Sequence, residues 1–409
     1  MTAEHSENVQ PLAAGSYRSP ASSVGQEMVL PVEVFLREGY EFRFNVLSNK
    51  IEVRARESSG SWHYVDKKTL NSIVVAARKA LPDEKSPKTL IADIINSEAT
   101  PEWNPVHAWF HDLSTWDGID RVTNLFKRLP GLSTAKVWQL HVWLLSVVAH
   151  WLQMDSLHAN ECVPVLIGEQ GCGKSTFWLR MLPPHLREYY LDHVNLSNKF
   201  DKEMALTNNL LVNLDELDQI RPSQQAELKQ MISKVRVNGR TIFASEQSDR
   251  TRFASFVATT NNRHPLRDVT GSRRYLCIEL MPGREIDNTS DIDYEQVYAQ
   301  VLHELKCGTR YWFNKDEIRG IQRENLRYQS VYNYETIIED CFRRPAADEE
   351  VEALPVTKIR NVIARLYPLL PNNHSTYVNL GLTLTRLGYP SRKSGNNHFY
   401  YVVPRNDVV

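Results

Sequence analysis

The sequence predicts an α/β fold in which an open sheet carries a phosphate-binding loop at the end of one strand. Three observations support this prediction. The apolar run 163–167 leads directly into the pattern G-x-x-x-x-G-K-S at residues 168–175. A second apolar run, 210–214, ends in two consecutive acids, and a third, 255–260, ends in an asparagine. Ligands in open α/β sheets bind at the carboxyl ends of the strands, where these polar residues stand.

The glycine-rich segment has the composition that a phosphate-binding loop requires. It follows the β-branched strand candidate Val163–Ile167, with Pro164 near the strand's beginning, and precedes the helix candidate Thr176–Leu182. Glycines let backbone N–H groups turn toward an anion, Lys174 reaches the β- and γ-phosphates, and the Ser175 hydroxyl ligates Mg²⁺. The residues predicted to hold the nucleotide are Gly168, Glu169, Gln170, Gly171, Cys172, Gly173, Lys174, Ser175 and Thr176.

Asp215 and Glu216 follow the second apolar run and supply the acidic partner that a phosphate-binding loop needs. We expect the Asp215 carboxylate to hold the Mg²⁺ shell and Glu216 to orient or deprotonate the attacking water. Asn261 ends the third apolar run, where its amide would face the γ-phosphate or that water. Phosphoryl transfer depends mainly on positioning and charge stabilisation, which these residue types provide.

Arg273 and Arg274 stand just before a further apolar run, Leu276–Leu280. An arginine supplied by a neighbouring subunit neutralises the charge that develops on a γ-phosphate, which requires nucleotide sites at subunit interfaces. The sequence does not distinguish between the two arginines. A solvated arginine pair at the start of a strand is the alternative interpretation.

The segments GEQGCGKS, LLVNLDEL, FVATTNN and TGSRRYLCIEL, all within residues 168–280, resemble the virulence-associated protein E family, whose ATPase is similar to superfamily 3 helicases. Trp116–Arg121 resembles a WDG-x-DR stretch that precedes the ATPase in replication proteins of mobile elements. The resemblance implies an AAA+-like core, ATP and Mg²⁺ as cofactors, a DNA substrate and a homo-oligomeric ring such as a hexamer. Relatives often carry a primase domain, but the residues before the phosphate-binding loop contain no paired-acid polymerase motif. A primase or polymerase would therefore be a separate partner.

Residues 229–252 contain six basic and two acidic residues, although the formal net charge of the chain is −1. A helix is predicted to end at Lys234 and a hairpin to cover residues 235–243, with Asn238-Gly239 as its tight turn. In the family that the chain resembles, a hairpin at this place lines the channel of the ring. We expect it to grip single-stranded DNA through the phosphates, whereas a solvated hairpin is the alternative. The side chains predicted to contact DNA here are Lys229, Lys234, Arg236 and Arg240.

The C-terminal segment, residues 355–409, contains seven basic residues and one acid. Two helix candidates are followed by a turn at 392–397 and a strand candidate, an order that predicts a winged helix. The second helix would read duplex DNA, such as an origin, and Arg392 and Lys393 would lie in the wing. Contact with another protein is the competing use of such a domain. The predicted helices cover 356–366 and 377–387, and the predicted strand covers 398–403.

The 409 residues, with 42% hydrophobic and 24% charged side chains, are typical of a multidomain intracellular enzyme. The apolar stretch Val137–Leu152 is too short and too polar to span a bilayer, and we expect a buried helix whose tryptophans 138, 143 and 151 belong to the core. The predicted parts are a flexible tail (1–26), a small α/β module (27–105) with a hairpin over 40–56 and a helix over 67–81, a helical segment (106–160), the P-loop ATPase core (161–285), a helical region (286–345) and a basic winged-helix-like domain (346–409).

Five cysteines without C-x-x-C spacing indicate neither a zinc site nor a disulfide framework, and no secretory signal precedes them, so we expect a cytoplasmic protein without a membrane partner. The sequence predicts an ATP-dependent DNA helicase or translocase of a phage, plasmid or integrated element. The alternative is an ATP-switched oligomer that binds DNA or a partner and recruits or interferes with replication machinery without unwinding. A metabolic P-loop kinase ranks third, because the arginine pair and the basic hairpin argue against it.

Overall fold

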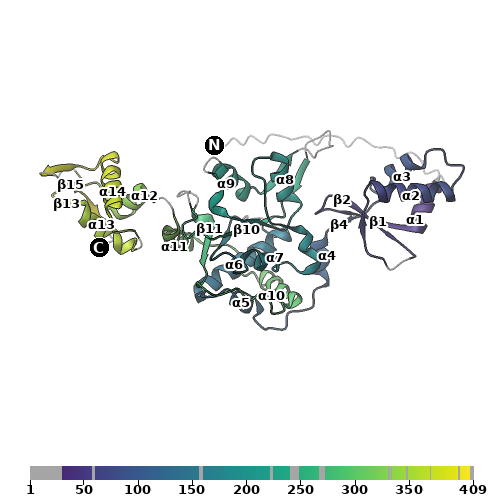
Figure 1. The fold of residues 1–409 in the computed structure, drawn as a ribbon, viewed down its shortest axis with the longest axis horizontal. Helices are drawn as coiled ribbons and strands as arrows, with labels where there is room; N and C mark the ends of the chain where they lie inside the picture. The colour runs from purple at the N-terminus through teal and green to yellow at the C-terminus, as the bar shows by residue number, and fades with distance from the viewer. Residues whose placement is uncertain are drawn as a thin grey trace, which may run out of the picture. The chain divides into compact units, whose positions relative to one another are not determined.

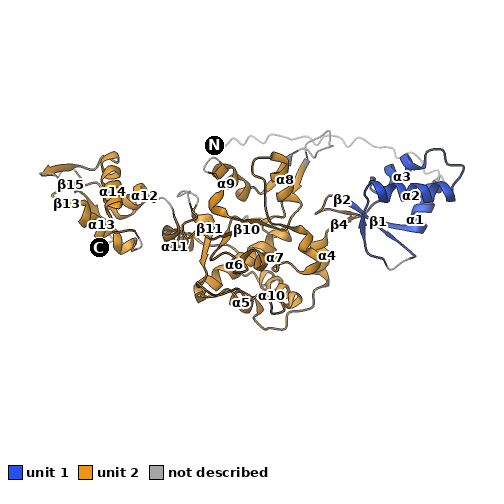
Figure 2. Cartoon of the chain, in the orientation of Figure 1, with its two compact units in different colours: residues 1–43, 51–101 blue, residues 44–50, 102–409 orange. Residues whose placement is uncertain are grey.

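The chain divides into two units, which consist of residues 1–43 with 51–101 and of residues 44–50 with 102–409 (Figure 2). The computed structural model describes residues 30–57, 60–155, 160–221, 224–239, 248–266, 272–329, 332, 334–346, 349–368, 370–394 and 397–405. The predicted tail, residues 1–26, lies outside the described residues.

The first unit packs three helices against one face of a β-hairpin. Alternate residues of the hairpin, such as Phe42 and Val53, join Leu36, Ile73 and Ile91 of the helices in a small core. The hairpin predicted over 40–56 and the helix predicted over 67–81 are both present. The elements are α1 (Pro31–Gly39), β1 (Tyr40–Asn45), β2 (Lys50–Ala55), β3 (His63–Tyr64), α2 (Lys67–Ala80) and α3 (Pro87–Ile95). The sheet order is β3-β2-β1-β4, in which β4 (Glu102–Trp103) pairs with Phe44 and Asn45, all assigned to the second unit.

The core of the second unit is a mixed α/β structure built on a parallel sheet of five strands. The strands are β5 (Val163–Ile167), β6 (Tyr190–Leu191), β7 (Leu211–Leu214), β10 (Ser255–Thr260) and β11 (Tyr275–Glu279), in the order β11-β5-β10-β7-β6. Every neighbouring pair of these strands is parallel. Helices cover both faces, so the strands are buried on both sides and appear in the sequence as continuous apolar runs. The predicted α/β class and the four predicted core strands are therefore present.

The two faces of this sheet belong to separate hydrophobic clusters. α8 (Lys199–Thr207) and α9 (Gln225–Ser233) cover one face, and α6 (Thr134–Trp151), α7 (Lys174–Leu179) and α10 (Tyr294–Lys306) cover the other (Figure 1). Within the described residues, no helix is long and apolar enough to cross a membrane. The remaining elements between residues 105 and 328 are α4 (Pro105–Asp112), α5 (Arg121–Phe126), η1 (Pro184–Tyr189), η2 (Leu217–Gln219), η4 (Ser272–Arg274), α11 (Lys315–Asn325) and η5 (Leu326–Tyr328).

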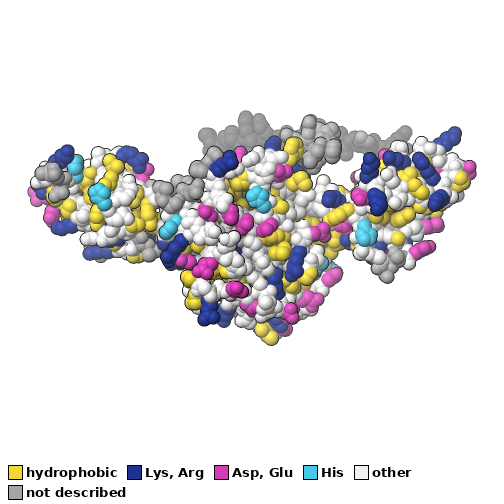
Figure 3. All heavy atoms as spheres, in the orientation of Figure 1, with side chains coloured by type: hydrophobic (Ala, Val, Ile, Leu, Met, Phe, Trp, Pro, Cys, Tyr) yellow, Lys and Arg dark blue, Asp and Glu magenta, His cyan; other side chains and the backbone are white. Residues whose placement is uncertain are grey.

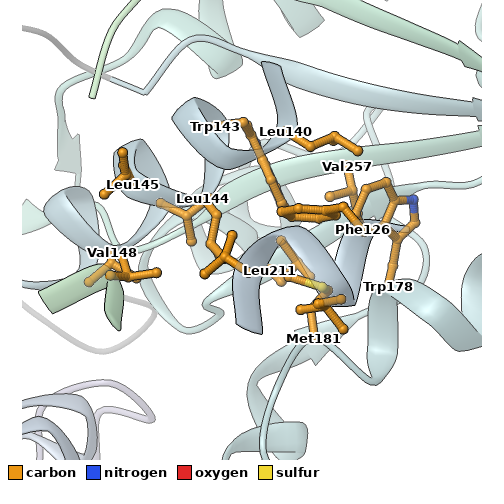
Figure 4. Packing of buried hydrophobic residues seen from close by; sticks show 14 of the residues in the cluster. Phe126, Leu140, Trp143, Leu144, Leu145, Val148, Trp178, Met181, Leu211 and Val257 are labelled. Carbon is orange, nitrogen blue, oxygen red and sulfur yellow. The ribbon is translucent and has the colours of Figure 1, made fainter. Parts of the chain in front are cut away.

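Helix α6 is apolar on nearly all sides and is buried on nearly all sides, as a helix of this composition should be. Trp143 of α6 packs against Trp178 of α7, and residues of α6 reach Val257 of β10 within the same cluster (Figure 4). The prediction that all three tryptophans are core residues is wrong for Trp138. That side chain is 42% exposed and meets Phe313 edge-on, because it lies on the one side of α6 that faces away from the cluster.

The basic hairpin is present, but its turn is not where the sequence predicts it. Strands β8 (Arg236–Gly239) and β9 (Ser248–Thr251) are antiparallel, and Gly239 pairs with Ser248. Asn238-Gly239 therefore lies within a strand, because Asn238 pairs with Asp249 and Gly239 with Ser248, and the prediction of a tight turn there is wrong. The residues that connect the two strands, including Arg240, lie outside the described residues.

The last part of the chain has its own hydrophobic cluster, built from helices and a three-stranded sheet of order β13-β15-β14. The two helices predicted there are present. Residues 392 and 393 lie in strand β14 instead of a turn, because β14 pairs with β15 as far as residue 394. The cluster also includes a helix that precedes the predicted boundary at 346. The elements are α12 (Tyr334–Cys341), β12 (Phe342–Arg343), β13 (Ala353–Pro355), α13 (Val356–Leu366), α14 (His374–Arg386), β14 (Ser391–Ser394), β15 (Asn397–Tyr401) and β16 (Val403–Pro404).

Candidate nucleotide-binding site

The loop between β5 and α7 needs glycine at three positions. Gly171 and Gly173 have φ angles of +83° and +89°, a region that glycine adopts without strain. A Cβ atom at Gly173 would also lie 2.4 Å from Nδ2 of Asn288, and one at Gly168 would lie 3.1 Å from Cδ1 of Leu280. Gly171 and Gly173 are therefore required by their backbone conformation, and a side chain at Gly168 would have to displace Leu280.

Lys174, the first residue of α7, folds back onto this loop. Its Nζ donates to the carbonyl oxygens of Gly168 at 2.8 Å and Glu169 at 2.7 Å. The segment after β11 supports the loop from outside, because Nδ2 of Asn288 donates to the Gly173 carbonyl at 2.9 Å. Asn288 is a residue that the sequence analysis missed, since nothing in its neighbourhood indicates a contact 115 residues away along the chain.

The register of the sheet gathers the predicted catalytic residues at its carboxyl edge. Ile167 pairs with Thr260, and Leu214 pairs with Ala258. The phosphate-binding loop, Asp215 and Asn261 therefore follow three adjacent strands, which are spaced about 4.8 Å apart. Asp215, Glu216 and Asn261 all have exposed side chains, so a ligand at this edge can reach them.

Hydrogen bonds from β10 orient the acidic motif. The Thr259 hydroxyl donates to Oδ1 of Asp215. Thr259 is 1% exposed, so its hydroxyl is fixed by the core and holds the carboxylate in one orientation. Glu216 has a φ angle of +51°, and this left-handed conformation costs a non-glycine residue on the order of 1 kcal/mol. Strain of this kind is concentrated at functional sites.

Asp218 is a second acidic residue at this edge that the sequence analysis missed. Its carboxylate accepts from Oγ1 of Thr260 at 2.6 Å and from Nδ2 of Asn262 at 3.3 Å. These bonds tie the turn that carries Asn261 to the segment that carries Asp215. The signal that could have found it is the third acid in the string D-E-L-D directly after β7.

A cavity of about 280 Å³ adjoins the two predicted catalytic acids. Asn213, Asp215 and Glu216 line it together with residues 193–196, which follow β6. Nδ2 of Asn213 donates to Oδ1 of Asp192 at 2.9 Å, and the Tyr190 hydroxyl donates to the same oxygen at 3.2 Å. Burial and the nearby Asp192 carboxylate raise the pKa of Tyr190, so its hydroxyl stays protonated and remains a donor.

The arginine pair lies at the opposite edge of the sheet. Tyr275, which follows Arg274, pairs with Val163 at the start of β5, so the arginines stand at the amino edge. Five strand residues separate them from the carboxyl edge, a length of about 16 Å. The structure therefore separates this pair from the phosphate-binding loop of the same chain.

The two arginines differ in their surroundings. The Arg274 side chain is 14% exposed, and its Nε and terminal nitrogen donate to the Ser233 hydroxyl at 3.1 and 2.9 Å. The Arg273 side chain is 51% exposed and stands 3.9 Å from the Glu161 carboxylate. Arg273 therefore projects outward, whereas Arg274 holds the end of α9.

The residues predicted to grip DNA begin next to this amino edge. Lys229 lies in α9, and burial together with the positive charge of Arg274 lowers its pKa. Lys234 follows the last residue of α9, and Arg236 is exposed at the start of β8. The structure thus places these three cations at and beside the base of the hairpin, away from the phosphate-binding loop.

A buried arginine fixes the base of the hairpin. Arg252, which follows β9, is fully buried and donates to the carbonyl oxygens of Ile232 and Lys234, both at 2.6 Å. It also donates to the carbonyls of Ala254 at 2.9 Å and Asn160 at 3.1 Å. Burial lowers its pKa to about 10, so the guanidinium remains charged at neutral pH.

Arg392 and Lys393 are exposed on β14, and the Arg392 guanidinium lies 5.4 Å from the centre of the Phe399 ring. On α14, the predicted reading helix, two apolar side chains are exposed among polar ones. Val378 is 44% exposed and Leu382 is 65% exposed, and Arg386 forms an ion pair with Glu335 at 3.1 Å.

Comparison with known proteins supports a family assignment. Two apo structures of the NrS-1 C-terminal region are similar to this chain: one has 14% identity and a TM-score of 0.45 and covers 91% of this chain and 99% of its own. The other has 13% identity and a TM-score of 0.44, with coverage of 91% and 98%. No curated protein matches. Residues 111–330, more than half of the chain, match the virulence-associated protein E-like domain, and the chain therefore belongs to that family.

Proposed function

We propose that the protein is an ATP-dependent DNA helicase or translocase that serves the replication of a phage, plasmid or integrated mobile element. The observation that carries the proposal is the meeting of the phosphate-binding loop, Asp215 and Asn261 at the ends of three adjacent parallel strands. This is the arrangement that a P-loop, AAA+-like nucleoside triphosphatase requires. Glycine-dependent loop geometry supports the same interpretation.

The residues present suit a magnesium nucleotide. Ser175 and Asp215 would hold Mg²⁺, which when bound neutralises charge on the phosphate oxygens. Lys174 would exchange the carbonyls of Gly168 and Glu169 for the β- and γ-phosphates, and this exchange keeps its ammonium paired in both states. Glu216 would orient the attacking water and take its proton, while Asn261 would contact the γ-phosphate.

The arginine pair supports action between subunits. An arginine about 16 Å from the loop of its own chain cannot reach that nucleotide, whereas an outward-facing arginine can reach the site of a neighbour. We assign this role to Arg273, because Arg274 is engaged with Ser233. A closed ring of identical subunits, such as a hexamer, would repeat this contact at every interface.

In this proposal the hairpin between β8 and β9 grips single-stranded DNA, with Lys234 and Arg236 at its base and Arg240 in its connection. The C-terminal cluster would be a winged-helix domain, because α13, α14 and the β14–β15 hairpin follow one another in that order. Arg392 and Lys393 would contact phosphates from the hairpin.

The test is an ATPase and strand-separation assay with the purified full chain, with and without single-stranded DNA, combined with mass determination in ATP. DNA-stimulated turnover in a large assembly is expected. Lys174→Ala and Glu216→Gln should each abolish turnover and unwinding. Lys315→Ala, which removes an exposed lysine of α11, should change neither. An inert monomer that ignores DNA would overturn the proposal.

A second candidate function is an ATP-switched oligomer that binds a replication partner without unwinding. The exposed Val378 and Leu382 of α14 favour it, because exposed apolar side chains suit protein contact better than DNA contact. In that case ATP would drive assembly. The Glu216→Gln variant, which permits nucleotide binding but not turnover, would then still support replication of the element. If the protein is a helicase, the same variant would not support replication.

A further inference from the structure

Helix α2 of the first unit exposes a face with a pair of cations at each end. Its inner face packs Ile73, Val74 and Ala77 into the core of the unit. Lys and Arg side chains are numerous on the helical side of this unit in the space-filling view (Figure 3). The exposed residues of α2 at helical spacing are Lys67, Lys68, Asn71, Ser72, Val75, Arg78 and Lys79.

The charges on this face follow a pattern. Lys67 and Lys68 lie in the first turn of α2, and Arg78 and Lys79 lie in the last. The residues between them on this face are uncharged. Corresponding members of the two pairs are eleven positions apart, a length of about 17 Å along a helix. The major groove of duplex DNA is about 12 Å wide, so cations at this separation can reach phosphates on both of its sides.

The overall composition of the first unit does not explain why cations are concentrated on the outer face of α2. The described residues of the first unit contain ten basic and ten acidic side chains, yet four of the cations and no acid lie on α2. On the sheet, by contrast, arginines are paired with acids: Arg43 with Glu52 at 2.6 Å, and Arg54 with Glu41. The concentration of charge is therefore specific to α2.

Helix stability explains only the second pair, because the macrodipole favours Arg78 and Lys79 in the last turn. Cations in the first turn of a helix are disfavoured by the macrodipole, and Lys67 and Lys68 occupy that turn. The Asp66 side chain caps the helix by accepting from the Thr69 N–H at 2.7 Å, and this bond lowers the pKa of Asp66. An open depression of about 770 Å³ adjoins the same turn, lined by Lys68, Asn71 and Val75 among others. A local cost beside a concave surface is typical of a binding site.

We propose that the outer face of α2 binds duplex DNA with the helix axis crossing the major groove. Lys67 and Lys68 contact the phosphates of one strand, and Arg78 and Lys79 contact those of the other. Asn71 and Ser72 lie at the level of the base edges, to which their side chains can hydrogen-bond, and the Val75 side chain can contact a thymine methyl group. The two separated pairs favour a duplex over a single strand, which is usually held by aromatic stacking that this face lacks. This binding requires neither nucleotide nor hydrolysis.

The test measures binding of the full chain to a labelled duplex of about 20 base pairs, without nucleotide, over a salt series. Replacing all four cations, as Lys67→Gln, Lys68→Gln, Arg78→Gln and Lys79→Gln, should weaken binding about tenfold or more and reduce the slope of log affinity against log salt by about 3.6. The matched control is Lys85→Gln with Lys88→Gln, because both lysines are exposed in the same unit but outside α2. The control should change affinity less than about twofold.

Two further measurements keep the proposal falsifiable. If the fourfold variant fails to fold, each pair replaced alone should reduce the slope by about 1.8. ATPase activity without DNA should equal that of the unaltered chain, so failure of this proposal is distinguishable from failure of the proposed motor. Unchanged duplex affinity and slope would overturn the proposal. Loss of binding only to anionic vesicles or to polyglutamate, with duplex binding intact, would also overturn it and identify a different partner.

Discussion

The two edges of the parallel sheet are built in opposite ways. At the carboxyl edge, Asp215, Glu216 and Asn261 are exposed, and buried threonines behind them donate to Asp215 and Asp218. At the amino edge, Arg252 is fully buried and bonded to backbone carbonyls, and Arg274 is bonded to Ser233. The first edge keeps its charges accessible for a ligand, whereas the second uses charge to fix the backbone. Arg273 is the exception, because it is exposed at the edge where its neighbour is fixed.

The largest effect is expected from substitution of Arg273, the exposed arginine at the amino edge. Arg273→Ala should lower DNA-stimulated turnover about a thousandfold while nucleotide affinity stays unchanged, because the arginine would act only as charge develops during transfer. Turnover and nucleotide titration measure the two quantities. Arg273→Lys should recover only part of the rate, since lysine lacks the planar guanidinium.

Subunit mixing decides whether the arginine acts between chains. In an equal mixture of Arg273→Ala and Lys174→Ala subunits, about a quarter of the interfaces would join an intact loop to an intact arginine. Turnover should therefore reappear on mixing two inactive proteins. If a mixture that has been shown to co-assemble stays inactive, Arg273 does not act in trans.

The next largest effect tests the structural role of the amino edge. Arg252→Met should lower the free energy of unfolding by about 3 kcal/mol, because four buried carbonyl oxygens lose their donor. Thermal or denaturant unfolding measures this change. Arg236→Met, at the exposed start of β8, is the control and should change the stability by less than about 0.5 kcal/mol. Equal effects of the two substitutions would show that the buried arginine does not fix the hairpin.

A smaller effect is expected behind the carboxyl edge. Thr259→Val keeps the shape of the side chain but removes the hydroxyl that donates to Asp215. The Mg²⁺ concentration needed for half-maximal turnover should rise about tenfold, because groups that orient a metal ligand contribute to its affinity. Thr260→Val removes the corresponding bond to Asp218 and should leave the Mg²⁺ dependence unchanged. Identical magnesium profiles for both variants would contradict the assignment of Asp215 as the ligand.

The smallest effect is a dependence of stability on pH at the amino edge. Burial, aided by the charge of Arg252, lowers the pKa of His150 below its ordinary value of about 6.5, although Asp155 opposes this. The unfolded chain therefore binds the proton more tightly, and the stability contributed by neutral His150 is lost as the pH falls below about 6.5. Unfolding at pH 7.5 and 5.5 should show this loss, by about 1 kcal/mol, and His150→Asn should reduce it. An unchanged pH profile in the variant would assign the loss to other groups.

Residues that satisfy a local pattern could be predicted from the sequence. The strands of the sheet are buried on both faces, so their continuous apolar runs located them to within a residue or two. The glycines of residues 168–173 indicated the loop between β5 and α7, and its binding of phosphate stays a prediction. The roles assigned to Lys174, Asp215, Glu216 and Asn261 stay predictions, although the register brings these residues to one edge.

Residues whose role depends on distant partners could not be predicted. Arg252 looked like one more cation of a basic hairpin, but the folded chain buries it among carbonyls from three segments. The Asn-Gly pair is typical of a tight turn, yet pairing to Ser248 extends the strand through it. The outer face of α2 was overlooked because the helix was located by its apolar side, and the side chains opposite that side do not affect its periodicity.

The position of β5 has a consequence for synthesis of the protein. Residue 167, directly before the phosphate-binding loop, pairs with Thr260 on one side and with Glu279 on the other. A ribosome-bound chain that ends before residue 280 lacks the outer strand, and one that ends before residue 255 lacks both neighbours. Because such non-local pairing must await the later segments, nascent chains leave the apolar β5 without either neighbour until β10 begins at Ser255, 88 residues after β5 ends at Ile167. We therefore expect chaperones to bind the apolar β5 during translation and so to prevent its aggregation.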